Sequence, residues 1–248
     1  MSERFTFPIA GIRRAKTRAA AAAQIVRDIE PVAGTIDPTA VLESFGCLRV
    51  NPKWKLLACL MGDHLGSESR VVAVPAGFDP ATGMATREPV SARSPGVDEP
   101  YAEYVWDQDL LLPPVAVRRF MTAVEGDGSP WSYLCASLAV RQLLDFAAFW
   151  HALYQHDWYE HVILAAWPPP RSLLEEPSWG WEGRAPLSWR PEVVVARDHV
   201  IVRIHTYRRP FANNEGVFLH EDRYALGSYD PAMQRIIEAE GRPAMVNF

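Results

Sequence analysis

The clearest pattern of apolar positions lies in the stretch 132–154, which is typical of an amphipathic helix. Its apolar side chains recur at helical spacing on one face: Leu143, Phe146, Ala147, Trp150, Leu153 and Tyr154. Arg141 and Asp145, four residues apart, are placed to pair on the other side. We therefore expect one long helix here, at the centre of the fold. Shorter helices are expected from about 12 to 29 and after Asp37-Pro38, which combines a capping residue with a proline tolerated at a helix start.

Strand-like patterns occupy much of the remaining chain. Six runs are rich in β-branched and aromatic residues: 54–61, 70–74, 161–167, 192–197, 200–208 and 217–226. The last three are separated by turn-forming residues and predict an antiparallel β-meander. A second Asp-Pro pair, Asp230-Pro231, precedes apolar residues at helical spacing and predicts a last helix. Because helices and strands do not alternate regularly, we expect an α+β fold, with the C-terminal meander packed against several helices.

Length and composition set the scale of the fold. A chain of 248 residues lies near the upper limit for one hydrophobic core. We expect a single globular domain over 1–248, or two packed lobes over about 1–128 and 129–248. Apolar residues make up 48% and charged residues 22%, so a sizeable core can form.

Several features predict a cytoplasmic protein. No run of residues is long and apolar enough to span a bilayer, and the first residues lack the layout of a secretory signal. The three cysteines, Cys47, Cys59 and Cys135, have apolar neighbours and no metal-binding spacing, as in proteins of reducing compartments. We therefore expect no membrane partner.

The net charge of −5 bears on the partner class. General nucleic-acid binding depends on neutralising phosphates with Lys and Arg, so this charge argues against it. The same charge favours association with a basic protein.

One cluster could hold a metal ion: His156, Glu160 and His161. His156 and Glu160 are four residues apart, but His156 and His161 would lie ~140° apart around a helix and could not share one ion. A catalytic zinc usually needs three protein ligands, so a metal-dependent hydrolase requires a further ligand brought in by the fold. A polar helix end whose imidazoles cap carbonyl groups is the alternative. No cofactor is expected.

A second candidate lies on the strand 200–208. Alternation places Arg203, His205 and Tyr207 on one side of the sheet, and His220 and Asp222 lie opposite them if the register allows. Such a group could bind an anion or transfer a proton, or it could form an ordinary solvated face. The sequence contains no nucleophile elbow, phosphate-binding loop or dinucleotide-binding motif. We therefore do not expect an enzyme.

Aromatic residues accompanied by acids form two candidate contact segments. The first contains Tyr101, Glu103, Tyr104, Trp106, Asp107 and Asp109; the second contains Trp179, Trp181 and Glu182. Rigid rings that anchor and charges that steer are typical of a protein-binding hot spot. Alternatively, these segments fold back over the core.

This combination, with the stretches Ser178–Arg184 and Gly216–Asp222 and with Tyr224, resembles the immunity proteins of bacterial polymorphic toxin systems, including those that counter type VI secretion effectors. The resemblance implies a cytoplasmic inhibitor that binds its cognate toxin directly. A nuclease-type toxin would be basic and would associate quickly with an acidic inhibitor. A subunit of a larger assembly, docking through 75–100, is a further alternative.

Overall fold

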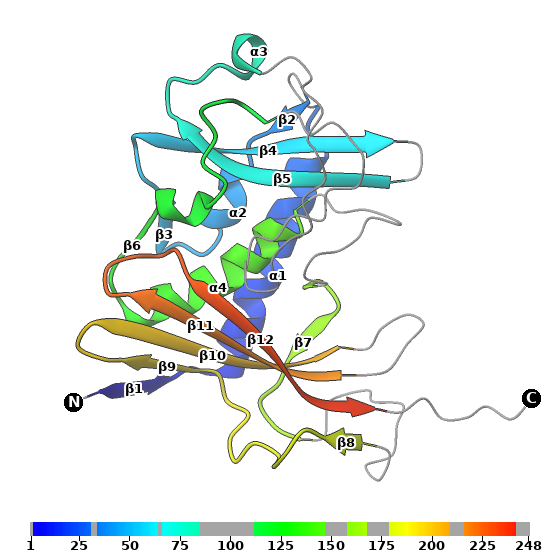
Figure 1. Cartoon of the computed structure of the whole chain (residues 1–248), viewed down its shortest axis with the longest axis vertical. Helices are drawn as coiled ribbons and strands as arrows, with labels where there is room; N and C mark the ends of the chain where they lie inside the picture. Colours follow the sequence, from blue (N-terminus) through cyan, green and yellow to red (C-terminus); the bar gives the residue numbers. More distant parts are fainter. Residues whose placement is uncertain are drawn as a thin grey trace, which may run out of the picture.

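A computed structural model describes residues 2–30, 34–63, 66–84, 112–146, 158–167, 179–208 and 216–241. A large antiparallel sheet is the main element of this part of the chain (Figure 1). Its hydrogen-bonded order is β1 (Glu3–Thr6), β9 (Glu192–Val195), β10 (His199–Arg208), β11 (Gly216–Ala225), β12 (Ala232–Gly241) and β8 (Trp179–Trp181). The short strand β7 (His161–Ile163) pairs with the end of β10, beyond the point where β9 stops.

The other described strands form two smaller sheets. The first consists of β2 (Thr35–Ile36), β4 (Trp54–Asp63) and β5 (Gly66–Pro75); the second consists of β3 (Leu48–Val50) and β6 (Val124–Gly126). The helices are α1 (Ile9–Arg27), α2 (Thr39–Glu43), α3 (Pro80–Gly83), α4 (Pro130–Leu144) and the 3₁₀ turn η1 (Phe120–Ala123).

Helices α1 and α4 lie between the large sheet and the sheet of β2, β4 and β5 (Figure 1). The buried stripe of α1 consists of Ile12, Ala15, Ala19, Ala23 and Val26, at helical spacing. Its alanines permit a close approach, and α1 contacts both α2 and α4. One hydrophobic cluster therefore continues from the small sheet, through the helices, to the inner face of the large sheet. None of the described helices is long and apolar enough to cross a membrane.

The expected α+β fold around one long central helix is wrong. The fold is mostly β-sheet, and strand residues outnumber helical ones. Helix α4 ends at Leu144, and Asp145 follows with φ −95° and ψ 13°. The Asp145 carboxylate accepts a hydrogen bond from the backbone N–H of Trp158 at 2.5 Å. This contact ties the end of α4 to the residues that lead into β7.

The expected last helix is also wrong, because residues 232–241 form strand β12. Met233, Ile236 and Ile237 have helical spacing, and Ala, Gln, Arg and Glu around them are good helix formers. The strand instead pairs antiparallel with β11 from Ala232 to Glu240. A long backbone ladder with β11 therefore overrides the local preference.

Candidate functional site

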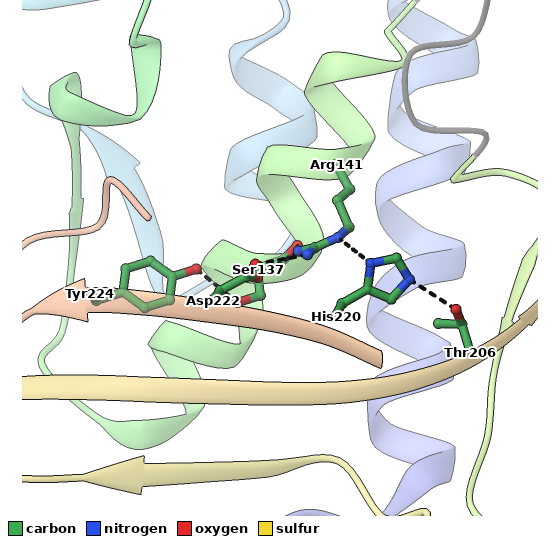
Figure 2. Close-up of polar contacts among 6 residues, drawn as sticks. All are labelled: Ser137, Arg141, Thr206, His220, Asp222 and Tyr224. Atoms are coloured by element: carbon green, nitrogen blue, oxygen red, sulfur yellow. Dashed lines mark hydrogen bonds and ion pairs between the residues drawn. The ribbon is translucent and has the colours of Figure 1, made fainter. Parts of the chain in front are cut away.

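A buried polar network joins α4 to the inner face of the large sheet (Figure 2). The Arg141 guanidinium binds both carboxylate oxygens of Asp222, at 2.6 and 2.8 Å, and also donates to the carbonyl of Ser137 at 2.8 Å. Both charged side chains are almost fully buried, with 2% and 1% of their surface exposed. Burial disfavours the charged form of Arg141, but the Asp222 carboxylate outweighs it and raises the pKa of the guanidinium. Arg141 therefore stays charged inside the core.

The network continues through two imidazoles. Arg141 Nε donates to His220 Nδ1 at 3.3 Å, so His220 carries its proton on Nε2, which lies 2.9 Å from Thr206 Oγ1. The Thr206 hydroxyl lies 2.6 Å from His161 Nδ1 and can donate to it. If Thr206 donates, His161 Nδ1 accepts and the ring carries its proton on Nε2. This Nε2 atom is buried and has no hydrogen-bond partner in the described ranges.

The environment of His161 favours a neutral ring. Burial lowers the pKa of His161 to about 2, and the positive charges of Lys16, Arg235, Arg208 and Arg141 act in the same direction. The ring stacks on the indole of Trp158, with centroids 5.8 Å apart. His161 is thus a neutral core residue of the network.

Basic side chains of α1 satisfy the carbonyls of the adjoining segment. Lys16 Nζ donates to the carbonyl of Trp158 at 2.7 Å and to that of His161, and it lies 4.4 Å from the centre of the Trp158 ring. Burial lowers the pKa of Lys16 to about 8, although Asp145 opposes this shift. Arg13 donates twice to the carbonyl of Ile163, at 2.7 and 3.2 Å.

The alternative metal cluster of His156, Glu160 and His161 does not assemble from its described members. Glu160 accepts a hydrogen bond from the exposed Tyr159 hydroxyl at 2.8 Å, whereas His161 is buried in the network. His161 opens strand β7 rather than ending a helix. No group of three potential metal ligands occurs among the residues that the structure places. His156 lies outside the described residues.

The second candidate site, which the sequence placed on β10 and β11, is divided between the two faces of the large sheet. Val202 is opposite Asp222 and Ile204 is opposite His220, so these acidic and imidazole side chains face α4. Arg203, His205 and Tyr207 lie on the other side. On that side Arg203 binds Glu221 at 2.7 Å and Glu192 at 3.1 Å.

Four tryptophans gather on this outer face, and we call them, with His205, Tyr207 and Glu238, the tryptophan face. The indoles are Trp167, Trp179, Trp181 and Trp189. The ring of Trp167 lies 5.1–5.5 Å from the other three, and Trp189 lies 5.3 Å from the His205 ring. Trp179 is buried, whereas Trp181 is half-buried and Glu182 is exposed. Trp179 and Trp181 thus belong to one cluster.

An acidic group lies within the tryptophan face. Val217 of β11 pairs with Ala239 of β12, but the next residue of β11, Phe218, pairs with Ile237. Glu238 is therefore the extra residue of a β-bulge in β12. Its Oε2 lies 3.4 Å from His205 Nε2. Neither Glu238 Oε2 nor His205 Nδ1 has a hydrogen-bond partner within the described part of the chain, although both atoms are buried. A carboxylate among indole rings has the chemistry that binds a cation.

Sequence reasoning named several of these residues but missed how the fold groups them. It pointed to Trp179 and Trp181, but Trp167, His205 and Glu238 join them only through strand pairing and the bulge. It also paired Arg141 with Asp145, whereas the carboxylate that binds Arg141 belongs to Asp222, 81 residues away. The predicted contact residues Tyr101, Glu103, Tyr104, Trp106, Asp107 and Asp109 lie outside the described residues.

Comparison with known proteins adds no relative: no family model, curated protein or solved structure matches the chain.

Proposed function

We propose that this protein is a non-enzymatic binding protein that recognises a basic protein partner through the tryptophan face. Within that class, we propose an immunity protein that acts in the cytoplasm and neutralises a cognate nuclease-type toxin by direct binding. The observation that carries the proposal is the half-buried Glu238 side chain on the tryptophan face, whose Oε2 atom is buried and lies 3.4 Å from the His205 ring nitrogen.

The tryptophan face has the composition of a binding hot spot. Half-buried indoles supply a rigid apolar surface at a small entropic cost, and this type of residue dominates interface energies. Leu187, on the segment between Trp181 and Trp189, is fully exposed and extends the apolar surface. These side chains could cover a partner group without rearrangement of the sheet.

The charge of this region favours a basic occupant. Glu182 follows β8, and its backbone N–H donates to the carbonyl of Glu238 at 2.8 Å. Glu240 is opposite Gly180 in the β8–β12 pair. Glu182 and Glu238 thus lie beside Trp179 and Trp181, whereas Glu240 shares the side of Gly180 and projects from the opposite face of the sheet. A partner arginine or lysine could bind Glu238 and place its cation against an indole ring.

The buried network supports a scaffolding role for the rest of the sheet. Arg141 is neutralised by Asp222, and the imidazoles of His220 and His161 are linked through Thr206. Such a network fixes the position of α4 on the strands that carry the tryptophan face on their other side.

The test begins with recovery of the partner. The tagged protein would be purified from its own source at low salt, and co-eluting chains would be identified by mass spectrometry. We expect a basic chain in near-stoichiometric amount. The recovered chain would then be expressed alone and together with this protein, and we expect growth arrest only when it is expressed alone.

Two variants locate the contact. Glu238→Gln keeps the shape of the side chain and Trp181→Ala removes one ring; each should weaken binding about tenfold or more in calorimetry, because both affect the centre of the face. Glu43→Gln, on the exposed end of α2, is the matched control and should bind normally. Equal affinity of all three variants would refute the assigned surface.

A further inference from the structure

The outer edge of β12 is exposed where β8 ends. Strand β12 pairs with β11 from Ala232 to Glu240, but on its other side β8 pairs only with the three residues from Ala239 to Gly241. Among the described strands, residues 232–237 therefore form an edge of the large sheet. A strand edge presents a row of backbone N–H and C=O groups to which another extended chain can add.

Both faces of this edge segment are exposed as well. Ile236 and Ile237 are 37% and 43% exposed, and they project to opposite sides of the sheet because side chains alternate along a strand. Gln234 and Arg235 are also exposed. A strand laid beside 232–237 could therefore cover apolar surface on both faces of the sheet at once.

Features that stop strand pairing limit the segment at both ends. Pro231 precedes it, and proline has no backbone N–H. The bulge at Glu238 follows it, and the carbonyl of Glu238 already accepts a hydrogen bond from the N–H of Glu182. The residues between these limits span roughly 20 Å, the length of a typical strand. They include neither proline nor lysine, the residue types that protect natural edges.

The outer side of this edge continues the tryptophan face. The register aligns His205 of β10 with Leu219 of β11, and Leu219 with Ile236 of β12. Ile236 therefore lies on the same side of the sheet as His205, two residues before Glu238. A chain added at the edge would reach the acidic group of the tryptophan face without crossing the sheet.

A second copy of this chain is a poor occupant of the edge. Antiparallel self-pairing centred on Arg235, over residues 233–237, would place two arginines directly opposite each other, which is destabilising. Pairing over one short strand also buries less than the roughly 1,600 Å² of a standard interface, so the occupant must contact a second surface. The adjoining tryptophan face supplies that surface, and its Glu238 favours a basic chain.

We propose that an extended segment of the basic partner adds to the large sheet as a strand beside residues 232–237. This inference depends on the proposed function and specifies how the partner is held. Backbone hydrogen bonds form along β12, side chains of the added strand cover Ile236 and Ile237 on the two faces, and a basic side chain lies beside Glu238.

Hydrogen exchange tests the strand addition directly. The free protein would be compared, by mass spectrometry, with its complex with the basic chain recovered at low salt. We expect exchange of the amides in 232–237 to slow by about tenfold or more on binding, because the N–H groups that point away from β11 gain backbone acceptors. Strand β1, at the other end of the sheet order, is the matched control and should exchange equally in both states.

Two variants separate strand addition from docking on one face. Ile236→Lys changes the outer side and Ile237→Lys changes the inner side, so an added strand should make each of them weaken binding about tenfold or more in calorimetry. Ile25→Lys, on the exposed face of α1, adds the same charge and should bind normally. Circular dichroism checks that each variant is folded, and the exchange measurement on the wild type needs no variant.

The outcomes distinguish this inference from the proposed function. A complex that forms without slower exchange in 232–237, or that tolerates Ile237→Lys, would refute strand addition and leave the binding function intact. Slow exchange in 232–237 within a concentration-dependent dimer of the protein alone would show that a second copy occupies the edge, and would also overturn the inference. If no basic chain binds the protein, both proposals fail.

Discussion

At the scale of single residues, the Arg141–Asp222 pair places two opposite charges in the core. Transfer of both charges from water costs several kcal/mol per ion by rough estimate, and only good geometry with further hydrogen bonds recovers it. Here the guanidinium contacts both carboxylate oxygens, the Ser137 carbonyl and His220. Loss of one partner would leave the other charge without compensation.

We therefore expect Asp222→Asn to lower the free energy of unfolding by about 3–5 kcal/mol. The double variant Arg141→Met with Asp222→Leu should lose much less, because no charge is left buried. Urea denaturation measures both. Arg203→Met, in the half-exposed ion-pair group of the outer face, is the control and should cost about 1 kcal/mol or less. A double variant as unstable as the single one would contradict this account.

His161 should make stability depend on pH. Its pKa is about 2 in the folded protein and close to the ordinary 6.5 when unfolded. Between these values the unfolded chain binds a proton that the folded chain does not, so stability falls as the pH decreases from 6.5. The slope from this group approaches roughly 1.4 kcal/mol per pH unit.

The measurement compares wild type with His161→Gln by urea denaturation at pH 7, 6 and 5. The variant should lose this part of the slope, whereas His199→Gln, at the partly exposed first position of β10, should keep it. Identical slopes for wild type and His161→Gln would show that the ring is protonated in the fold.

At the scale of elements, the local pattern predicted strands better than helix ends. Strands were expected within β4, β5, β9, β10 and β11, and they are present there. Period-two patterns with turns between them are local signals, so one sequence suffices to find them. The end of α4 and the conformation of β12 depend on Trp158 and on β11, which are distant partners that no local pattern contains.

The contact of β6 with the segment after β11 is also non-local, and it is tight. A Cβ at Gly126 would lie 2.3 Å from the Tyr229 ring. The Tyr229 hydroxyl is fixed by the N–H of Gly128 at 2.9 Å and by Ser132 Oγ at 2.7 Å, so the ring cannot move freely.

Gly126→Ala should therefore destabilise the protein by about 1–3 kcal/mol through overpacking. Gly11→Ala is the matched substitution, because a Cβ at this position in α1 would meet nothing within 4 Å. It should stabilise by up to about 1 kcal/mol, since alanine is the better helix former. Thermal unfolding distinguishes the two; a neutral Gly126→Ala would mean that Tyr229 has another position available.

At the scale of the whole molecule, one hydrophobic cluster includes residues of both larger sheets. Leu56 and Val71 of the small sheet belong to it, as do Val193 and Val202 of the large sheet, with α1 and α4 between them. Such continuity favours cooperative unfolding. The indoles of the tryptophan face belong to a separate, smaller cluster.

We expect a single unfolding transition in urea, with the same midpoint by far-ultraviolet circular dichroism and by tryptophan fluorescence. The tryptophan face is built on β8, β10 and β12, so it should be lost with the sheet. A fluorescence midpoint clearly below that of circular dichroism would show that this face opens on its own. Trp181→Phe, which removes one indole from the face, would then reduce the early fluorescence change.

The candidate site could be predicted only in part from the sequence, because its residues are brought together by strand pairing between distant segments. Aromatic residues beside acids drew attention to Trp179 and Trp181, because composition is a local property. The position of Glu238 depends on the bulge, and the separation of His205 from His220 depends on the β10–β11 register. A one-residue change of register would have placed these imidazoles on the same face.

The pairing of β1 with β9 has a consequence for synthesis of the chain. Glu3 lies opposite Val195, which the ribosome adds 192 residues later. At about 5–20 residues per second, roughly 10–40 s pass before the first strand can find its partner. Throughout this interval β1 has an unpaired edge, so a strand made long before β9 is among the last to be locked into the sheet.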